Sequence, residues 1–152
     1  MLDMVVAHGL VKRYGEFSAV DGISFTVQAG ECFGFLGPNG AGKTTTIRMI
    51  TCVSPVTDGS LTVDGMHVQT HQRQSKSILG VVPQDDNLDP ELTVRQNLRA
   101  YARYFDLPKG MAESRIDEVL DLFQLADKQK GRIDSLSGGL KRRLTVARGL
   151  LN

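Results

Sequence analysis

A glycine-rich stretch at residues 37–44 constrains the fold of this chain more than any other feature. It reads Gly-Pro-Asn-Gly-Ala-Gly-Lys-Thr and fits the phosphate-cradling pattern of Gly, four residues, Gly, Lys and Ser/Thr. The apolar run at residues 31–36 before it predicts a strand, and residues 45–50 after it predict a helix. The motif therefore stands between a strand and a helix, where it predicts a nucleotide triphosphate site and not merely a glycine-rich turn.

Each residue type in this stretch has a physical reason to be there. The glycines allow backbone conformations that turn successive N–H groups inward around phosphate oxygens. The helix that begins near Gly42 adds its positive end. Lys43 can place a cation on the outer phosphates, and the Thr44 hydroxyl is of the kind that holds a bridging magnesium ion. The predicted nucleotide-binding residues of the loop are Gly37, Asn39, Gly40, Ala41, Gly42, Lys43, Thr44 and Thr45.

Length and charge exclude several classes of protein. The chain has 152 residues, which suits one domain with a substantial core. Its formal charge of +1 implies no special attraction to nucleic acid or acidic lipid. Residues 1–6 lack the pattern of a signal peptide, and no apolar segment approaches membrane-spanning length. We therefore expect a cytoplasmic location.

Several short segments around the loop have the character of strands. Residues 4–13 and 23–28 partly alternate in polarity and predict antiparallel strands at one edge of a sheet. Residues 61–63 predict a short strand, and the apolar run at 78–82 predicts a buried one. Tyr14 falls between the first two strands, where its ring can either stack on an adenine or pack against the fold.

From residue 93 onward the apolar residues recur with the period of a helix. Thr93 and Gln96 have the spacing of a capping box at a helix start. The apolar face of this first helix comprises Val94, Leu98, Tyr101, Ala102 and Phe105. The apolar face of a second helix comprises Ile116, Val119, Leu120 and Phe123. We expect these two helices to form an insertion packed on the nucleotide-binding core.

A third amphipathic helix follows a second glycine pair. Ser137, Gly138 and Gly139 precede it and make another helix start suited to an anion. Its apolar residues are Leu140, Leu144, Ala147 and Leu151, and its cations are Lys141, Arg142, Arg143 and Arg148. In a nearly neutral chain we interpret these cations as a solvated face and not as a nucleic-acid surface.

The phosphate loop and residues 136–139 (Leu-Ser-Gly-Gly), in this order and with Gln84 between them, resemble the ATP-binding cassette (ABC) family. The resemblance covers essentially the whole chain. It implies that Tyr14 is the aromatic that stacks on adenine. Gln84 would be the residue that senses magnesium and the attacking water, near the contact with a membrane partner. Ser137, Gly138 and Gly139 would form the signature motif.

The resemblance also implies a mechanism. Two such domains face each other head to tail, and each ATP lies between the phosphate loop of one and the signature of the other. Lys43 and Thr44 would then act in cis, whereas Ser137 and Gly139 would donate to the γ-phosphate in trans. Lys43, Gln84 and Ser137 are the implied catalytic residues, with Mg²⁺ held by Thr44 and Gln84.

Within the family, residues 33–40 and 141–143 look like the exporter ATPases for drugs and lipo-oligosaccharides, and residues 83–89 are particularly similar to the nodulation-type lipo-oligosaccharide exporters. This similarity implies an ATP-binding subunit, peripheral on the inner face of the membrane. Its implied partners are a transmembrane permease and a second copy of the domain, without nucleic acid. The alternatives are a soluble ABC-type ATPase that acts on nucleic acid or ribosomes, and an ATP-binding fragment that does not hydrolyse.

The expected fold is an α/β P-loop NTPase core with an antiparallel β edge and an inserted α-helical subdomain, incomplete at its C-terminus. We expect residues 1–92 to form the nucleotide-binding core and residues 93–152 the helical subdomain. The family continues with a strand that bears an aspartate and a glutamate, and later a histidine. Since no such strand or histidine follows the signature helix before Asn152, we expect an amino-terminal piece of a longer domain. The complete domain would hydrolyse ATP, and residues 1–152 alone would be inactive.

Overall fold

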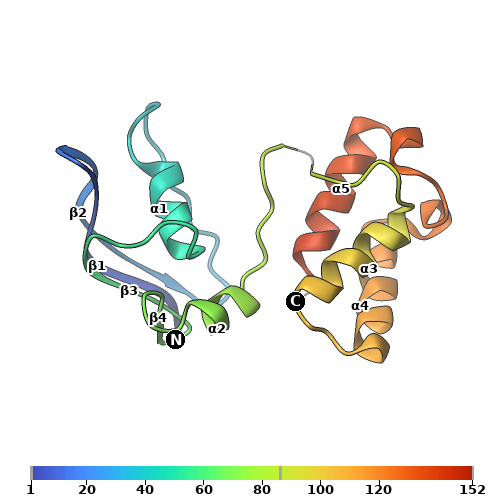
Figure 1. The fold of residues 1–152 in the computed structure, drawn as a ribbon, viewed down its shortest axis with the longest axis horizontal. Coiled ribbons are helices and arrows are strands. Elements are labelled where there is room, and N and C mark those ends of the chain that lie inside the picture. The colour runs from blue at the N-terminus through green and yellow to red at the C-terminus, as the bar shows by residue number, and fades with distance from the viewer. Residues whose placement is uncertain (1, 86, 152) are drawn as a thin grey trace. The chain divides into compact units, whose positions relative to one another are not determined.

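The computed structural model describes residues 2–85 and 87–151, and the chain divides into two compact units, Met1–Leu79 and Gly80–Asn152 (Figure 1). Asp86 belongs to the segment 83–89 that carries part of the exporter resemblance, and it lies outside the described residues. Met1 and Asn152 lie outside the described residues as well.

The first unit contains a four-stranded antiparallel sheet with the strand order β2-β1-β3-β4. Its strands are β1 (Asp3–Tyr14), β2 (Phe17–Gln28), β3 (Asp58–Val63) and β4 (Met66–His67). Its helices are α1 (Lys43–Ile50) and α2 (Gln72–Ser77). The predicted antiparallel edge is confirmed, because Val6 of β1 pairs with Thr26 on one side and Thr62 on the other.

The core of the first unit lies between the sheet and α1. Leu10 and Leu61 are fully buried from the sheet, and Met49 is fully buried from α1. Along β3, Leu61 and Val63 are buried while Thr62 between them is less so, as the alternation of a strand requires. This core holds α1, and with it the glycine-rich loop, against the strands.

Two of the predicted strands are wrong. Residues 31–36 and 78–82 form no strand in the described structure, because no neighbouring strand forms a hydrogen-bonded ladder with them. Phe33 and Phe35 instead pack on Phe25 of β2, with ring centroids 5.5 and 5.1 Å from the Phe25 ring. An apolar sequence supplies the side chains that suit a sheet, but it does not supply the partner strand.

The second unit is helical. It contains α3 (Val94–Tyr104), α4 (Lys109–Leu122) and α5 (Gly138–Gly149), with short 3₁₀ turns at Ala126–Lys128 and Ile133–Ser135. These elements confirm the three predicted helices. Their apolar faces meet in one core whose fully buried members include Leu98, Ile116, Leu120, Leu125, Leu144 and Leu151. None of the described helices has the length and apolar character needed to cross a membrane.

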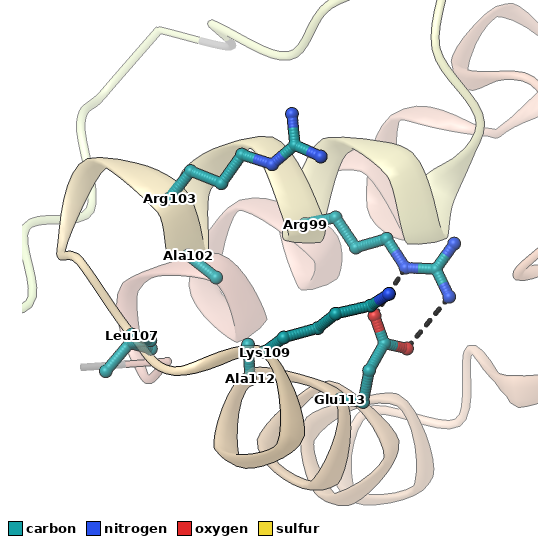
Figure 2. A pocket seen from close by; sticks show the side chains of 7 residues that line it. All are labelled: Arg99, Ala102, Arg103, Leu107, Lys109, Ala112 and Glu113. Carbon is teal, nitrogen blue, oxygen red and sulfur yellow. Dashed lines mark hydrogen bonds and ion pairs between the residues drawn. The ribbon is translucent and has the colours of Figure 1, made fainter.

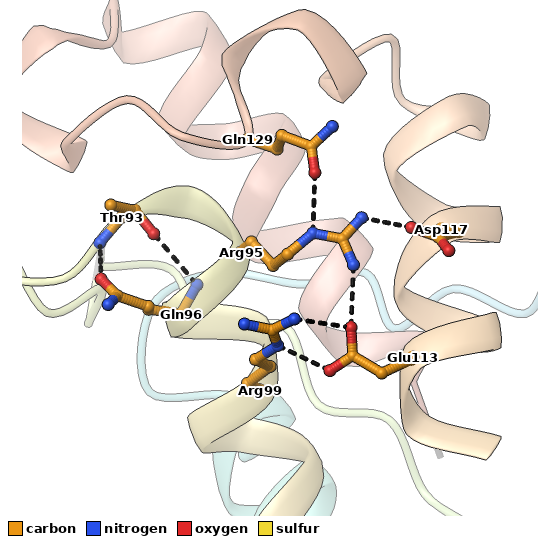
Figure 3. Close-up of polar contacts among 7 residues, drawn as sticks. All are labelled: Thr93, Arg95, Gln96, Arg99, Glu113, Asp117 and Gln129. Carbon is orange, nitrogen blue, oxygen red and sulfur yellow. Dashed lines mark hydrogen bonds and ion pairs between the residues drawn. The ribbon is translucent and has the colours of Figure 1, made fainter. Parts of the chain in front are cut away.

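The predicted capping box is present at the start of α3. The Gln96 N–H donates to the Thr93 hydroxyl oxygen at 3.3 Å, and the Thr93 N–H donates to Gln96 Oε1 at 2.8 Å. Figure 3 shows both bonds beside a charged network that joins α3 to α4. In that network Arg99 binds both carboxylate oxygens of Glu113, at 2.6 and 2.9 Å. Arg95 donates to the same carboxylate and to Asp117.

Candidate functional site

The loop that leads into α1 has the backbone shape that its glycines predict. Gly37, Gly40 and Gly42 all have positive φ, at 152°, 85° and 85°. At Gly42 the space is also closed, because a Cβ atom there would lie 2.4 Å from the Ala19 carbonyl oxygen of β2. Glycine is therefore required at position 42 both by conformation and by the close approach of β2.

The first turn of α1 leaves its N–H groups open. Gly42 caps the helix without a side-chain bond, and the first helical bond runs from the Thr46 N–H to the Gly42 carbonyl at 2.8 Å. The N–H groups of Lys43, Thr44 and Thr45 find no backbone acceptor within residues 2–85. Such donors at the positive end of a helix suit an anion.

Lys43 lies folded over the same loop. Its ammonium group donates to the carbonyl oxygens of Gly37 at 2.7 Å and Pro38 at 2.6 Å. These acceptors are neutral, so a phosphate group would bind the ammonium more strongly than they do. The Thr44 side chain is exposed, and its hydroxyl makes no hydrogen bond to a described residue. A hydroxyl oxygen in this state fits the hard-oxygen ligation of Mg²⁺.

The remaining predicted loop residues lie around this turn. Asn39 and Ala41 are exposed, and the Ala41 N–H donates to the Pro38 carbonyl at 3.2 Å, which closes a turn. Thr45 is half-buried on α1. The structure thus collects all eight predicted loop residues around the start of one helix.

Tyr14 is the last residue of β1 and lies on a buried cation. The Lys12 ammonium group is 4.9 Å from the centroid of the Tyr14 ring, and it donates to the Pro55 carbonyl at 2.7 Å. Lys12 is only 6% exposed, whereas Tyr14 is 49% exposed. The ring thus packs on Lys12 and still presents surface to solvent; its stacking on adenine stays a prediction.

Sequence reasoning did not single out Lys12. The signal was available in the spacing, since residues two apart on a strand project from the same face. Lys12 and Tyr14 have this relation at the end of β1. A cation under an aromatic ring is a pairing that this spacing allows.

The predicted signature residues form the start of α5 in the second unit. Ser137 is the N-cap, and its hydroxyl accepts a bond from the Leu140 N–H at 3.4 Å. Gly138 and Gly139 are exposed, and a Cβ added to either would meet none of the described atoms within 4 Å. Packing in the described chain therefore does not require glycine here. Their lack of side chains leaves the backbone N–H groups accessible to an anion.

Gln84 is exposed and makes no hydrogen bond to a described residue. Residues on both sides of it are held by α5. Arg142 donates to the Pro83 carbonyl at 2.5 Å, and Arg148 donates to the Asn87 carbonyl at 3.1 Å and to its side-chain oxygen. The second unit therefore brings the Gln84 region against the helix that Ser137 caps.

Arg148 corrects one expectation from the sequence. The cations of α5 were predicted to be solvated, but Arg148 is only 6% exposed and lies 4.9 Å above the centroid of the Tyr101 ring. Burial lowers the pKa of Arg148 and raises the pKa of Tyr101. The spacing carried the signal: Arg148 is four residues after Leu144 and three before Leu151, on the buried side of the helix.

The described residues contain no group of three or more His, Cys, Asp and Glu side chains that could hold a metal ion.

A pocket of about 400 Å³ lies in the second unit, where the end of α3 meets the start of α4 (Figure 2). Arg99, Lys109 and Glu113 are among its lining residues, and none of the predicted site residues is. Its Arg99 is already paired with Glu113, which reduces its pull on an outside anion.

Comparison with known proteins identifies the family of this chain. Residues 20–152 match the ABC transporter family. The chain is 49% identical over 144 residues to Nod factor export ATP-binding protein I of Ralstonia nicotianae, covering 95% of this chain and 45% of that protein. It is 50% identical over 143 residues to the protein of the same name from Rhizobium meliloti, covering 94% and 43%. The chain thus spans just under half the length of these curated relatives.

The fold is also found among solved structures. The structure of cbiO1 from Clostridium perfringens, part of the ABC transporter complex cbiONQ, matches with a TM-score of 0.88 and 23% identity. That match covers 99% of this chain and 62% of the solved one. An ATP-binding subunit of another ABC transporter matches with a TM-score of 0.84 and 24% identity, covering 97% and 62%. These likenesses establish the fold as that of an ABC ATPase domain.

Proposed function

The chain belongs to the ABC transporter family, and on that premise we propose that it forms the ATP-binding part of an exporter's ATPase. The observation that carries this proposal is the loop before α1. Its open N–H groups and the Lys43 ammonium group converge on one helix start, which suits the phosphates of a nucleotide. Tyr14 would add the base contact from the end of β1.

In this proposal the residues of the loop bind and orient the phosphates. Lys43 exchanges the carbonyls of Gly37 and Pro38 for the outer phosphate oxygens, where the opposite charge makes the bond stronger. The hydroxyl of Thr44 and the side-chain oxygen of Gln84 would hold Mg²⁺, which neutralises charge on the phosphates when bound. Gln84 would orient the attacking water.

The start of α5 would act on a second ATP. In a head-to-tail pair of domains, Ser137, Gly138 and Gly139 of one copy donate to the γ-phosphate held by the other copy. Two helix starts surround more negative charge than one, so ATP stabilises the pair and hydrolysis weakens it. The separation of the two copies would be delivered to a transmembrane permease.

The direction of transport follows the relatives. Two proteins about half identical to this chain are named for Nod factor export. We infer that this protein also serves export, with a lipo-oligosaccharide as the first cargo class to test. It would lie on the inner face of the membrane, bound to its permease. We further infer that residues 1–92 act as the nucleotide-binding core and residues 93–152 as the helical subdomain.

The proposal is tested on the complete protein, purified with its permease in lipid vesicles. ATP hydrolysis and binding are measured for the unsubstituted protein, for Lys43→Ala and for Lys76→Ala. Lys76 is an exposed lysine on α2 and gives a matched loss of charge. We expect Lys43→Ala to abolish hydrolysis and Lys76→Ala to leave it unchanged. Undiminished hydrolysis by Lys43→Ala would sink the assignment.

A further inference from the structure

The segment that carries Gln84 is tied to the neighbouring helices at several points. We call the described residues 80–85 and 87–89 the Gln84 segment. At its beginning it lies in backbone contact with the end of α5: a Cβ added to Gly80 would lie 1.8 Å from the Gly149 carbonyl oxygen. A Cβ added to Gly149 would lie 2.9 Å from a methyl group of Val82. Both glycines are needed for this approach.

Two arginines of α5 then hold the segment on either side of Gln84. Arg142 donates to the Pro83 carbonyl at 2.5 Å, one residue before Gln84. Arg148 donates through two nitrogens to the carbonyl and the side-chain oxygen of Asn87, three residues after it. Each of these bonds has a charged donor, so each is stronger than a bond between neutral groups.

The end of the segment is tied to α3. Asn97 is only 5% exposed, and it accepts from the Asp89 N–H at 2.8 Å and donates to the Asp89 carbonyl at 3.0 Å. The Gln84 side chain has no such bond among the described residues. The backbone on both sides is therefore held while the side chain is left available.

The burial of Arg148 makes it unfavourable to separate the Gln84 segment from α5. Its guanidinium group is buried and stacked on Tyr101, and its Nε finds no acceptor among the described residues. Within the described chain, Asn87 thus supplies the hydrogen bonds of a buried cation. Separation of Asn87 from α5 would leave this buried cation over the Tyr101 ring but without a hydrogen-bond acceptor among the described residues.

From these contacts we propose that Arg142 and Arg148 are positioning residues that fix the Gln84 segment to α5. Gln84 and the Ser137–Gly139 helix start then move as one body. A displacement of either one, on arrival or loss of a phosphate group, displaces the other. The consequence for turnover rests on the function proposed above, whereas the mechanical link rests on the contacts alone.

The link is tested first without nucleotide, by amide hydrogen exchange on the complete protein. Arg142 is exposed, so Arg142→Ala is expected to fold normally. We expect the amides of residues 84, 85 and 87 to exchange about tenfold faster in this variant, while those of α4 stay unchanged. The control is Arg115→Ala, which removes an exposed arginine of α4 and should change neither region. Unchanged exchange at residues 84, 85 and 87 in Arg142→Ala would overturn the proposal.

The second measurement separates binding from turnover. In Arg142→Ala the ATP dissociation constant should stay within about twofold, since the phosphate loop is untouched, while kcat falls at least about tenfold. Arg142→Lys keeps a cationic donor and should restore part of kcat. Arg148→Lys keeps the charge but loses the two-point contact with Asn87, so its kcat should fall as in Arg142→Ala. Faster exchange with an unchanged kcat would also overturn the proposal.

Absence of turnover in the unsubstituted protein would instead refute the proposed function. The exchange result would still decide whether the Gln84 segment is fixed to α5.

Discussion

The ammonium group of Lys12 lies 4.9 Å from the centroid of the Tyr14 ring, with Lys12 buried and Tyr14 half-exposed. The cation steadies one side of the ring and leaves surface available for a base. We therefore predict that Tyr14→Ala weakens ATP binding by about 1 to 3 kcal/mol, through the loss of stacking. Titration calorimetry on the complete protein measures the effect.

Two controls accompany that measurement. Tyr14→Phe keeps the ring and loses only the contact of 3.5 Å between the hydroxyl groups of Tyr14 and Ser54, so it should bind ATP nearly as well. Tripolyphosphate has no base, and its affinity should be the same in all three proteins. An unaltered ATP affinity in Tyr14→Ala would refute the stacking role.

Glu113 predicts an acid-dependent loss of stability in the second unit. The bonds from Arg99, followed by those from Arg95, lower the pKa of Glu113 below its ordinary value. Its contribution is therefore complete above the ordinary glutamate pKa and is lost as the pH falls through the lowered pKa of the folded state. Because the group is partly exposed, we expect about 1 kcal/mol or less.

The measurement is urea unfolding between neutral and acid pH. Glu113→Gln cannot titrate, so it should be less stable than the unsubstituted protein at neutral pH, and the difference should shrink on acidification. Asp121→Asn changes an exposed carboxylate of the same helix and serves as the control. A difference for Glu113→Gln that is constant with pH would contradict the assigned cause.

The same substitution, glycine to alanine, should have opposite effects at two places in the second unit. At Gly80 the added methyl group would lie 1.8 Å from the Gly149 carbonyl oxygen, so the contact must open. We predict a loss of about 1 to 3 kcal/mol in the free energy of unfolding. A Cβ added to Gly110 of α4 would meet no described atom within 4 Å outside the neighbouring residues and the helix backbone, and alanine there should raise the free energy of unfolding by about 0.5 to 1 kcal/mol. Equal effects at both positions would show that the Gly80 contact is not formed.

The capping box at α3 predicts a third stability change. Thr93→Ala removes the hydroxyl oxygen that accepts the Gln96 N–H, and should cost about 1 kcal/mol. Thr93→Ser keeps the oxygen and should cost less than half as much. Thermal unfolding of the three proteins compares them. A serine variant as unstable as the alanine variant would trace the loss to the threonine methyl group instead of the cap.

Local signals in the sequence predicted local structure well. The spacing of Thr93 and Gln96 predicted a helix start that the structure shows bond for bond. The pattern at residues 37–44 predicted a loop before α1, and its glycines have the positive φ that the pattern requires. These predictions are confirmed because each feature depends only on residues that are close together in the sequence.

Features that depend on distant segments were predicted less well. Residues 31–36 have the composition of a strand, but strand formation needs a ladder from another segment, and composition does not say whether one is present. The charge of Arg148 predicts exposure, and its burial in the structure contradicts that prediction. Its burial depends on two distant residues. Asn87 lies 61 residues away in the sequence, and Tyr101 lies on another helix.

The two glycines at the start of α5 also have a thermodynamic consequence. Glycine lowers helix stability by about 1 kcal/mol relative to alanine, and nothing in the described chain packs in the space that side chains at Gly138 and Gly139 would fill. The first turn of α5 is therefore less stable than another sequence would make it. This turn is expected to unfold locally more easily than the rest of the helix, and an anion that bound its N–H groups would stabilise it. In the proposed function, α5 is therefore least stable at the end whose backbone N–H groups would contact the nucleotide.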